Sequence, residues 1–355
     1  MTKFDKLFNK LPEDIDCVLV TSDVNRRYFT GMKSSDGTVI AFRNKAYLII
    51  DFRYIEKARA TVTSAEVIEQ KKLYNQLAEL IHSHSAKNIA VESQTMTINQ
   101  LNTLKKHIRD IEFIDTDVLS NAINLLRMVK DDYEISCIKK AQEIAETAFE
   151  GILDFIKEGV TEREIAMELE RLMAVNGSEG VSFETIVLSG ENTSMPHGVP
   201  SDKKVKKGEF VLMDYGAVWN GYHSDMTRTV CIGEPTDEMR KVYNIVLTAQ
   251  MTAINAAHAG MTGQEFDLIA RDIISKEGYG EYFGHSLGHG VGLEIHEKPN
   301  ASPNYAHILN ENAVVTVEPG IYIAGKFGVR IEDFVVLHEN GCINLTKSAK
   351  NIISL

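Results

Sequence analysis

The stretch MDYGAVWNGYHSDMTRTV, residues 213–230, decides the fold around the most informative part of this chain. Its NG dipeptide at 220–221 is the strongest short signal for a two-residue β-hairpin turn. Such a turn places Asp214 opposite Thr227. Asp225 lies two residues before Thr227 and therefore on the same face, so the two aspartates are diagonal neighbours with Cα atoms about 7–8 Å apart. We expect both carboxylates to reach one common site.

A second hairpin is predicted in VEPGIYIAGKFGVRIED, residues 317–333. A three-residue loop at 324–326 places Glu318 directly opposite Glu332. Two like charges that face each other destabilise a sheet. A bound cation would reverse the sign of that interaction, so this register favours a metal site.

The third segment is GHSLGHGVGLEIHE, residues 284–297, in which His289 stands between glycines. Glycine has no Cβ, so the backbone here can come close to a ligand. The GxGxG pattern lacks the βαβ setting and downstream acid of a dinucleotide fingerprint. His285 and His289 have the spacing of a helical zinc pair, but the glycines disfavour a helix. We therefore expect His289 to act as a single ligand.

Together these segments offer four carboxylates and one imidazole: Asp214, Asp225, His289, Glu318 and Glu332. Such an oxygen-rich set with one nitrogen is typical of a pair of divalent cations. Without a metal, four clustered negative charges would repel one another strongly. Any one of these acids alone could be an ordinary charge at the edge of a strand. Their ordered combination predicts a dinuclear metal centre.

The bulk composition limits the function classes. The chain has 355 residues, 44% of them apolar and 25% charged, with a net charge of −12. This length favours two domains, and the negative charge disfavours nucleic acid or an anionic membrane surface as a partner. The four cysteines include no CxxC pair, and the first residues lack an apolar signal core. We expect a cytoplasmic enzyme with reduced cysteines.

The pattern of elements predicts a boundary near residue 122. Residues 1–122 alternate strands and helices without clustered ligands, and a polar turn at 43–45 indicates a hairpin. Residues 123–355 begin with a long helical pattern, 125–159, that is entered through Asp131.

Two capping-box signatures then mark the second helix of each of two helix pairs, Thr161 with Glu164 and Thr262 with Glu265. Each helix pair is followed by a hairpin. This order of helix pair, hairpin, helix pair and hairpin predicts two similar αβ halves.

MDYG…YHSDMTRT, GHSLGHGVGLEIHE, VEPGIY and GVRIED resemble the signature of the pita-bread metallopeptidases. The chain is most similar to their proline-specific branch, the Xaa-Pro dipeptidases (prolidases) and Xaa-Pro aminopeptidases. NRRYFTGMKSSDG, 25–37, and LIIDFRY, 48–54, resemble the creatinase-type N-terminal domain of that branch. The resemblance implies an α/β (α+β) protein: a catalytic pita-bread domain at 123–355, preceded by a smaller creatinase-like α/β domain at 1–122.

The resemblance also implies roles for the metal ligands. Asp225 and Glu332 would bridge two divalent ions, Asp214 would complete the shell of one ion, and His289 with Glu318 that of the other. The ions would be Mn²⁺ or Co²⁺, sometimes Zn²⁺, and would activate a water for attack on the scissile carbonyl. Glu318 would carry the proton from that water to the leaving nitrogen.

Further residues match substrate-binding and catalytic positions of the family. His197 would lie beside the substrate carbonyl, and His296 would stabilise the tetrahedral intermediate. His285 would lie near the proline end, and Arg330 beside the metals. An X–Pro bond has no N–H and carries a constrained ring, so its enzyme needs a dedicated pocket. We expect Phe183, Tyr322 and His285 to form its wall. The partners implied are a small peptide substrate and a second copy of the chain, in a homodimer.

Three alternatives remain at this point. A methionine aminopeptidase shares the metal chemistry but normally lacks the N-terminal domain. A creatinase-like hydrolase works without metal and would not need the five ligands. A metal-free pita-bread protein that binds peptides or histones belongs to another functional class. Whether the chain prefers dipeptides or longer peptides is also open.

Overall fold

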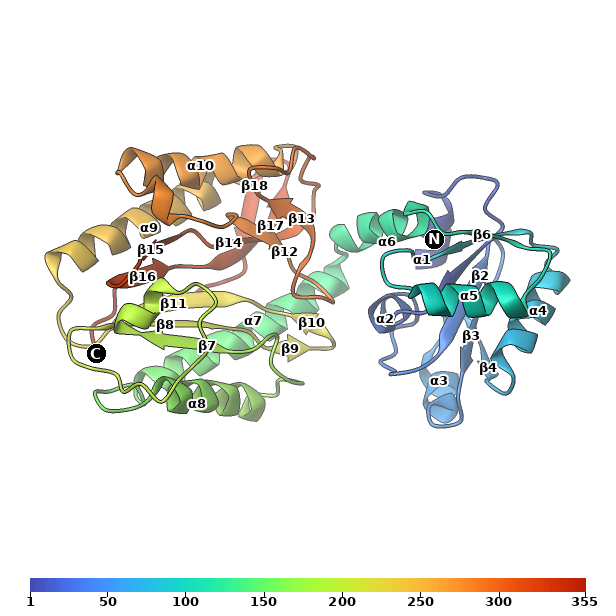
Figure 1. The fold of residues 1–355 in the computed structure, drawn as a ribbon, viewed down its shortest axis with the longest axis horizontal. Coiled ribbons are helices and arrows are strands. Elements are labelled where there is room, and N and C mark those ends of the chain that lie inside the picture. The colour runs from blue at the N-terminus through green and yellow to red at the C-terminus, as the bar shows by residue number, and fades with distance from the viewer. The chain divides into compact units, whose positions relative to one another are not determined.

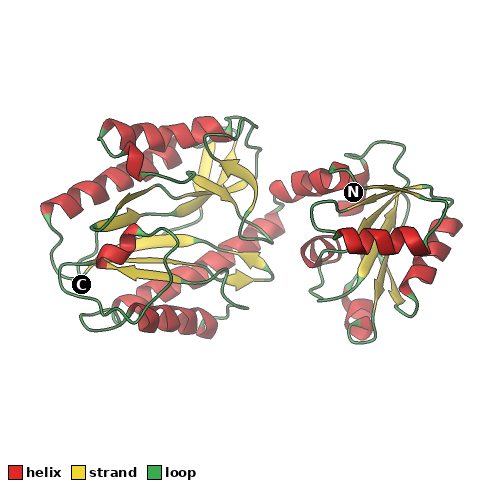
Figure 2. Ribbon diagram, in the orientation of Figure 1, coloured by secondary structure: helices red, strands yellow, loops and turns green.

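The computed structural model describes residues 1–355 and divides into two compact units, Met1–Arg127 and Met128–Leu355 (Figure 1). Both units combine helices and strands (Figure 2), as expected for a mixed α/β protein. None of the helices is both long and apolar enough to cross a membrane.

The first unit is a six-stranded sheet in the order β4-β3-β2-β1-β5-β6. Strands β2 and β3 pair antiparallel, which confirms the hairpin predicted around residues 43–45. The buried apolar side chains of β1, β2, β3 and β5 form a core with those of α4 and α5. The elements are α1 (Lys3–Phe8), β1 (Cys17–Val20), α2 (Asp23–Thr30), β2 (Thr38–Phe42), β3 (Ala46–Ile50), α3 (Ile55–Thr61), β4 (Glu66–Glu69), α4 (Leu73–Ser83), β5 (Asn88–Val91), α5 (Ile98–His107), β6 (Glu112–Ile114) and α6 (Val118–Met128).

The second unit consists of two similar halves, which confirms the predicted duplication. In one half, α7 and α8 pack on the three-stranded sheet β11-β8-β7; in the other, α9 and α10 pack on the five-stranded sheet β13-β12-β14-β17-β18. Figure 1 shows the two helix pairs on the outer sides, with the strands between them. Each half has its own apolar core beneath its helices. The functional side chains described below lie between the two halves.

The elements of the second unit alternate in the predicted order. They are α7 (Asp132–Leu153), α8 (Glu162–Val175), β7 (Ile186–Ser189), η1 (Gly190–Ser194), β8 (Phe210–Tyr215), β9 (Val218–Trp219), β10 (Tyr222–His223), β11 (Met226–Cys231), α9 (Asp237–Ala256), α10 (Gly263–Lys276), η2 (Gly280–Tyr282), β12 (Gly288–Gly290), β13 (Glu297–Ala301), β14 (Val314–Val317), β15 (Gly320–Ile323), β16 (Phe327–Arg330), β17 (Asp333–His338) and β18 (Gly341–Asn344).

The helical pattern predicted over 125–159 is entered through Asp131, as predicted, but it is broken before that residue and α7 ends at Leu153. Helix α6 ends at Met128, and α7 begins only after Asp131, whose extended backbone and capping box with Glu134 start a new helix. The apolar periodicity runs through this junction because both helices bury a face, so it hides the break. The capping boxes predicted for α8 and α10 are both present, at Thr161 with Glu164 and at Thr262 with Glu265.

Candidate metal centre and substrate cavity

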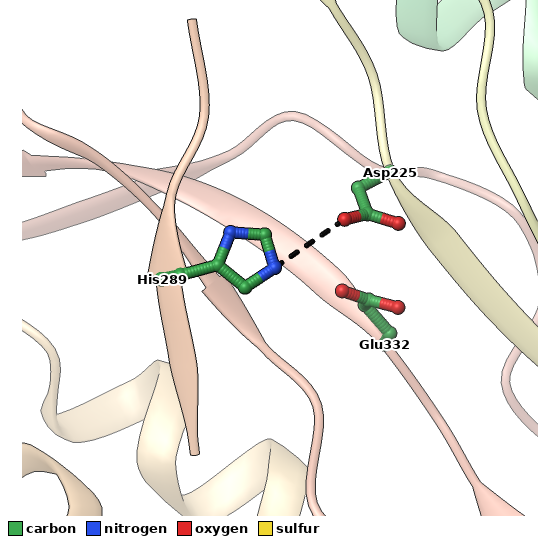
Figure 3. Close-up of side chains that lie close together, drawn as sticks. All are labelled: Asp225, His289 and Glu332. Carbon is green, nitrogen blue, oxygen red and sulfur yellow. Dashed lines mark ion pairs between the residues drawn. The ribbon is translucent and has the colours of Figure 1, made fainter. Parts of the chain in front are cut away.

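Three of the predicted ligands form a tight cluster (Figure 3). Asp225 precedes β11, His289 lies in β12, and Glu332 lies between β16 and β17. One potential ligand atom from each lies within 4.8 Å of those of the other two. The Nε2 atom of His289 is 3.5 Å from Oδ2 of Asp225. Residues more than 100 positions apart are thus brought to one point.

The other two predicted ligands adjoin this cluster. Oε1 of Glu318 is 3.5 Å from Nε2 of His289. Asp214, in β8, pairs through Oδ2 with the guanidinium of Arg330. All five predicted ligands line a single cavity of about 930 Å³. The structure therefore brings together the whole set that the sequence singled out.

The first hairpin has the predicted register. Asp214 pairs with Thr227 across β8 and β11. The turn residues Asn220 and Gly221 both have positive φ, 48° and 76°, which is the backbone of a type I′ turn. This turn twists in the same sense as the strands, so it fixes the pairing that carries the two aspartates.

The second hairpin also has the predicted register, but its ladder is interrupted at the glutamates. Gly320 pairs with Arg330 on one side of the interruption, and Val317 pairs with Asp333 on the other. Glu318 and Glu332 therefore stand opposite each other in a gap between two short ladders. The gap frees their backbone groups for other partners.

The electrostatics of the cluster require a counter-charge. Burial, followed by the charge of Glu332, raises the pKa of Asp225 well above its usual range. Burial, followed by the charge of Glu318, does the same to the pKa of Glu332. Burial raises the pKa of Glu318 to about 8. These carboxyl groups cannot all be ionised at neutral pH unless cations lie between them.

The donor set fits divalent cations. Oδ1 of Asp214 and Oε1 of Glu332 are buried and accept no hydrogen bond within the protein. Unpaired buried carboxylate oxygens are costly unless something outside the chain binds them. Two such oxygens, two more carboxylates and one imidazole match the ligands of a carboxylate-rich metal centre.

The ring of His289 is oriented for binding through Nε2. Its Nδ1 lies 3.1 Å from the carbonyl oxygen of Gly290, which can only accept, so Nδ1 carries the proton and Nε2 keeps its lone pair. Burial, followed by the charge of His296, lowers the pKa of His289 to about 4. The imidazole is therefore neutral at pH 7, as a metal ligand must be.

The glycines beside His289 allow close packing between strands. A Cβ on Gly288 would come within 2.0 Å of the carbonyl oxygen of Thr316, and one on Gly290 within 2.5 Å of that of Lys298. Because these two glycines have no side chain, β12 fits between β13 and β14. These two glycines therefore let neighbouring strands approach closely.

Two threonine hydroxyls that support the ligands were missed from the sequence. Thr227 donates to Oε2 of Glu332 at 2.7 Å and accepts from Nε of Arg330 at 3.0 Å. Thr316 donates to Oε1 of Glu318 at 3.2 Å and accepts from the backbone N–H of His289 at 3.0 Å. Each hydroxyl orients a glutamate, as outer-shell groups of metal sites do. Threonine in a strand is common, so no local signal identifies these two.

A buried ion pair behind the ligands was also missed. Arg228 donates to the backbone oxygens of Thr227 and Glu332, at 2.9 and 2.6 Å, and pairs with Asp333 at 2.8 Å. It therefore joins the two hairpins next to Glu332. Arg228 lies inside a predicted strand and Asp333 begins another that is mainly apolar, and charged residues at buried positions are normally paired, which was the available signal.

His285, Tyr322 and Arg330 form a continuous hydrogen-bonded chain. Nη1 of Arg330 donates to the hydroxyl of Tyr322 at 2.9 Å, and that hydroxyl lies 2.9 Å from Nε2 of His285. Nδ1 of His285 donates to the carbonyl of Ser286 at 2.8 Å. Burial, followed by the charge of Arg330, lowers the pKa of His285 to about 4. The chain holds a neutral imidazole at the cavity wall.

Of the three residues expected in the wall of the proline pocket, His285 and Phe183 line the cavity. Arg330, expected beside the metals, lines it as well. Tyr322 lies behind the lining, because its hydroxyl is engaged by Arg330 and His285. It therefore acts on the wall only through these two neighbours.

The remaining predicted histidines, His197 and His296, also line the cavity. The ring of His296 packs against that of His289, with centroids 4.3 Å apart. Burial lowers the pKa of His296, and the charge of His197 contributes in the same direction. The imidazoles of the cavity are thus close enough to affect one another.

Helix α10 holds the segment that carries His285. Asp267 accepts from the backbone N–H of Leu287 at 2.9 Å and pairs with Arg271 at 2.6 Å. Arg271 in turn donates to the carbonyl oxygens of Phe283 and His285, at 2.9 and 2.8 Å. This clamp connects one helix of the outer layer to the cavity wall.

Comparison with known proteins matches this geometry. The model of metallopeptidase family M24 matches residues 136–339, and that of the creatinase/prolidase N-terminal domain matches residues 4–129. This chain belongs to metallopeptidase family M24. As a member of the family it is a metallopeptidase, an enzyme that uses a divalent metal, and Asp225, His289 and Glu332 form a cluster that could hold such an ion.

Relatives of this family member share its whole length. The Xaa-Pro dipeptidase of Pyrococcus furiosus is 40% identical over 353 residues, with 99% of both chains covered. The solved structure of an Xaa-Pro dipeptidase from Bacillus anthracis has a TM-score of 0.95 at 41% identity, with 99% of both chains covered. That of an X-Pro aminopeptidase from Thermotoga maritima has a TM-score of 0.91 at 41% identity, covering 96% of this chain and 98% of that one.

Proposed function

We propose that this metallopeptidase hydrolyses the bond between an N-terminal residue and proline, in Xaa-Pro dipeptides or in peptides with proline second. The observation that carries the proposal is the convergence of five ligand side chains and three further histidines on one cavity. The names of the relatives support the substrate class, because Xaa-Pro dipeptidases and an X-Pro aminopeptidase match over nearly the full chain.

We assign the metal-binding role to Asp214, Asp225, His289, Glu318 and Glu332. These side chains would hold two divalent ions, with Mn²⁺ expected and Co²⁺ or Zn²⁺ as alternatives. When bound, such a pair of ions supplies Lewis acidity and lowers the pKa of a water. The remaining contributions come from the protein itself.

Glu318 is the group placed to move a proton. Its Oε1 accepts from Thr316, which leaves Oε2 available to hold a proton. This oxygen can take up the proton of the attacking water and release it again. We assign transfer of that proton to the leaving nitrogen of proline.

The histidines of the cavity serve to bind and orient the substrate. His197 and His296 face the cavity and can donate a ring N–H to the oxygen of the scissile carbonyl. His285 and Phe183 offer apolar ring surface to the pyrrolidine. Because proline provides no N–H, recognition by such surface replaces the hydrogen bond that ordinary peptidases use.

The test uses the full chain, stripped of metal with a chelator and reloaded with Mn²⁺. Hydrolysis of Gly-Pro or Ala-Pro-Ala, but not of Met-Ala-Ser, supports the proposal. The ratio of rates on the dipeptide and the tripeptide decides between dipeptidase and aminopeptidase action. Protein with full metal content that cleaves no X–Pro substrate of either length overturns it. Chelator-resistant hydrolysis of creatine would reveal the creatinase-like alternative.

We further propose that the first unit is a creatinase-like N-terminal domain and that the protein is a homodimer. Phe52 lies on the surface of the first unit, where its side chain is 75% exposed beside the ion pair of Arg53 and Asp51. An ordered, exposed aromatic side chain of this kind suits a contact between copies. A mass of one chain in light scattering at micromolar concentration would contradict the dimer. The cytoplasmic location stays a prediction.

A further inference from the structure

A buried carboxylate outside the metal centre holds both ends of one cavity loop. Glu162, the first residue of α8, is 0% exposed. Its Oε1 accepts from the backbone N–H and the hydroxyl of Ser189, at 2.7 and 2.9 Å, and from Nδ2 of Asn192 at 3.0 Å. Its Oε2 accepts from the backbone N–H and the hydroxyl of Ser201, at 3.1 and 2.6 Å. Five donors thus converge on one side chain.

The segment between these two serines carries His197. In its middle, the Thr193 hydroxyl accepts from the backbone N–H of Gly328 at 2.7 Å. His197 itself lines the cavity, and its imidazole makes no hydrogen bond within the protein. No side-chain partner therefore fixes the ring. Its position depends on the backbone of residues 189–201, and that backbone is anchored at both ends by Glu162.

We propose that Glu162 is a positioning residue for His197: its carboxylate fixes the loop 189–201 so that the imidazole faces the scissile carbonyl. The role in catalysis rests on the proposed X–Pro hydrolysis, whereas the mechanical clamp does not. A carboxylate can be buried here because five hydrogen bonds and the N-terminus of α8 stabilise its charge.

The contacts explain why glutamate is needed rather than glutamine. Each carboxylate oxygen faces one backbone N–H, at Ser189 and at Ser201. Hydroxyl groups can turn to accept, but a backbone N–H can only donate. The amide of Glu162→Gln would place its NH₂ against one of these donors in either orientation. One end of the loop therefore loses its carboxylate contact in an otherwise isosteric variant and keeps only its backbone contacts, Ser189 with Val211 or the carbonyl of Ser201 with the N–H of Arg163.

We expect Glu162→Gln to lower kcat on an X–Pro peptide by about 10- to 100-fold with little change in KM, because misplacing a catalytic group by about 1 Å has effects of this size. Glu164→Gln is the matched control. It removes the same charge from the same turn of α8, while its exposed side chain only caps Thr161. Its activity should stay within about twofold of the wild type, since glutamine also forms a capping box.

A double-mutant cycle separates positioning from general loss of structure. In a His197→Ala background, Glu162→Gln should cause no further loss, because the group that it positions is absent. Losses that multiply in the double variant would overturn the proposal. Equal activity of Glu162→Gln and wild type would overturn it as well.

Hydrogen–deuterium exchange tests the clamp without any activity. Glu162→Gln should raise exchange within residues 189–201 and leave β8 and β11 unchanged. Unchanged exchange in this segment refutes the clamp. If the wild type cleaves no X–Pro peptide, the proposed function fails while this measurement still decides the clamp. If Glu162→Gln does not fold, Ser201→Ala is the substitute, because it removes one of the five donors. The same increase in exchange and the same non-additivity with His197→Ala are then expected. Their absence would count against the proposal.

Discussion

Replacing Tyr322 by phenylalanine tests the buried chain that joins Arg330 to His285. The Tyr322 hydroxyl contacts Nη1 of Arg330 and Nε2 of His285, each at 2.9 Å. Tyr322 is 9% exposed and Arg330 3% exposed, so the lost oxygen leaves a largely buried gap. The variant keeps the ring but leaves the buried guanidinium of Arg330 and the half-buried imidazole of His285 without this partner.

The size of the effect follows from the two contacts. A hydrogen bond to a charged group contributes about 1.5–3 kcal/mol, and one between neutral groups about 1 kcal/mol. We therefore expect Tyr322→Phe to lower the free energy of unfolding of the second unit by about 2–4 kcal/mol. For a unit of this size, that corresponds to a fall in Tm of roughly 5–15 °C.

The assay is urea unfolding of the metal-free protein, and Tyr243→Phe is its matched control. Tyr243 is 1% exposed, and its hydroxyl donates to a single backbone carbonyl, that of Lys350, at 2.8 Å. This control should cost about 1 kcal/mol. If Tyr322→Phe lowers the free energy of unfolding no more than Tyr243→Phe does, the hydrogen-bonded chain does not stabilise the cavity wall and the reasoning fails.

Three further outcomes are expected. Thr227→Val should weaken divalent-metal binding by about 10- to 100-fold in a chelator-competition titration, because Glu332 loses the hydroxyl that orients it; unchanged affinity would contradict this. The pKa of His285 is lowered from 6.5 to about 4, so the unfolded chain binds more protons than the folded protein between these values. The contribution of His285 to the free energy of unfolding should then be fully present above about pH 6.5 and decline as the pH falls towards 4. In urea titrations of metal-free protein, His285→Asn should remove at most about 3 kcal/mol of that decline. Gly221→Ala should cost about 1 kcal/mol, since φ is 76° there; a circular dichroism melt equal to wild type would refute the turn assignment.

The registers of both hairpins were predictable because local chemistry sets them. The NG turn fixes the pairing of Asp214 with Thr227. In the second hairpin the three-residue loop also gave the observed pairing, from Gly320 with Arg330 outward. Once the registers are known, period-two alternation places the carboxylates on one face. The convergence of the ligands therefore follows from short-range rules.

The supporting contacts were not predictable, because they join segments distant in sequence. Glu162 reaches Ser201 across 39 positions, and Thr227 reaches Glu332 across 105. Glu162 follows the N-cap of a helix, where acidic residues are ordinary, so its burial could not be read from its neighbours. The position of Tyr322 in its strand is compatible with a pocket residue. Its hydroxyl, however, accepts a hydrogen bond from Arg330 and lies behind the cavity wall.

Interruptions of the two ladders explain how the halves come to share one site. Between β8–β11 and β9–β10, Gly216 lies so close to the chain opposite that a Cβ would be 1.9 Å from the carbonyl oxygen of Ser224. Asp225, next to that serine, leaves the ladder. In the second hairpin Pro319 has no N–H to donate, so pairing stops beside Glu318.

The freed backbone groups then bond to other strands. The N–H of Glu332 donates to the carbonyl of Thr227 in the first hairpin, at 3.1 Å. The N–H of Glu318 donates to the carbonyl of Leu287, just before the strand of His289, at 2.8 Å. An unbroken ladder would have engaged both N–H groups within the hairpin itself. The break at Glu332 therefore adds a bond between the two halves, and the break at Glu318 ties the hairpin to the segment that carries His289.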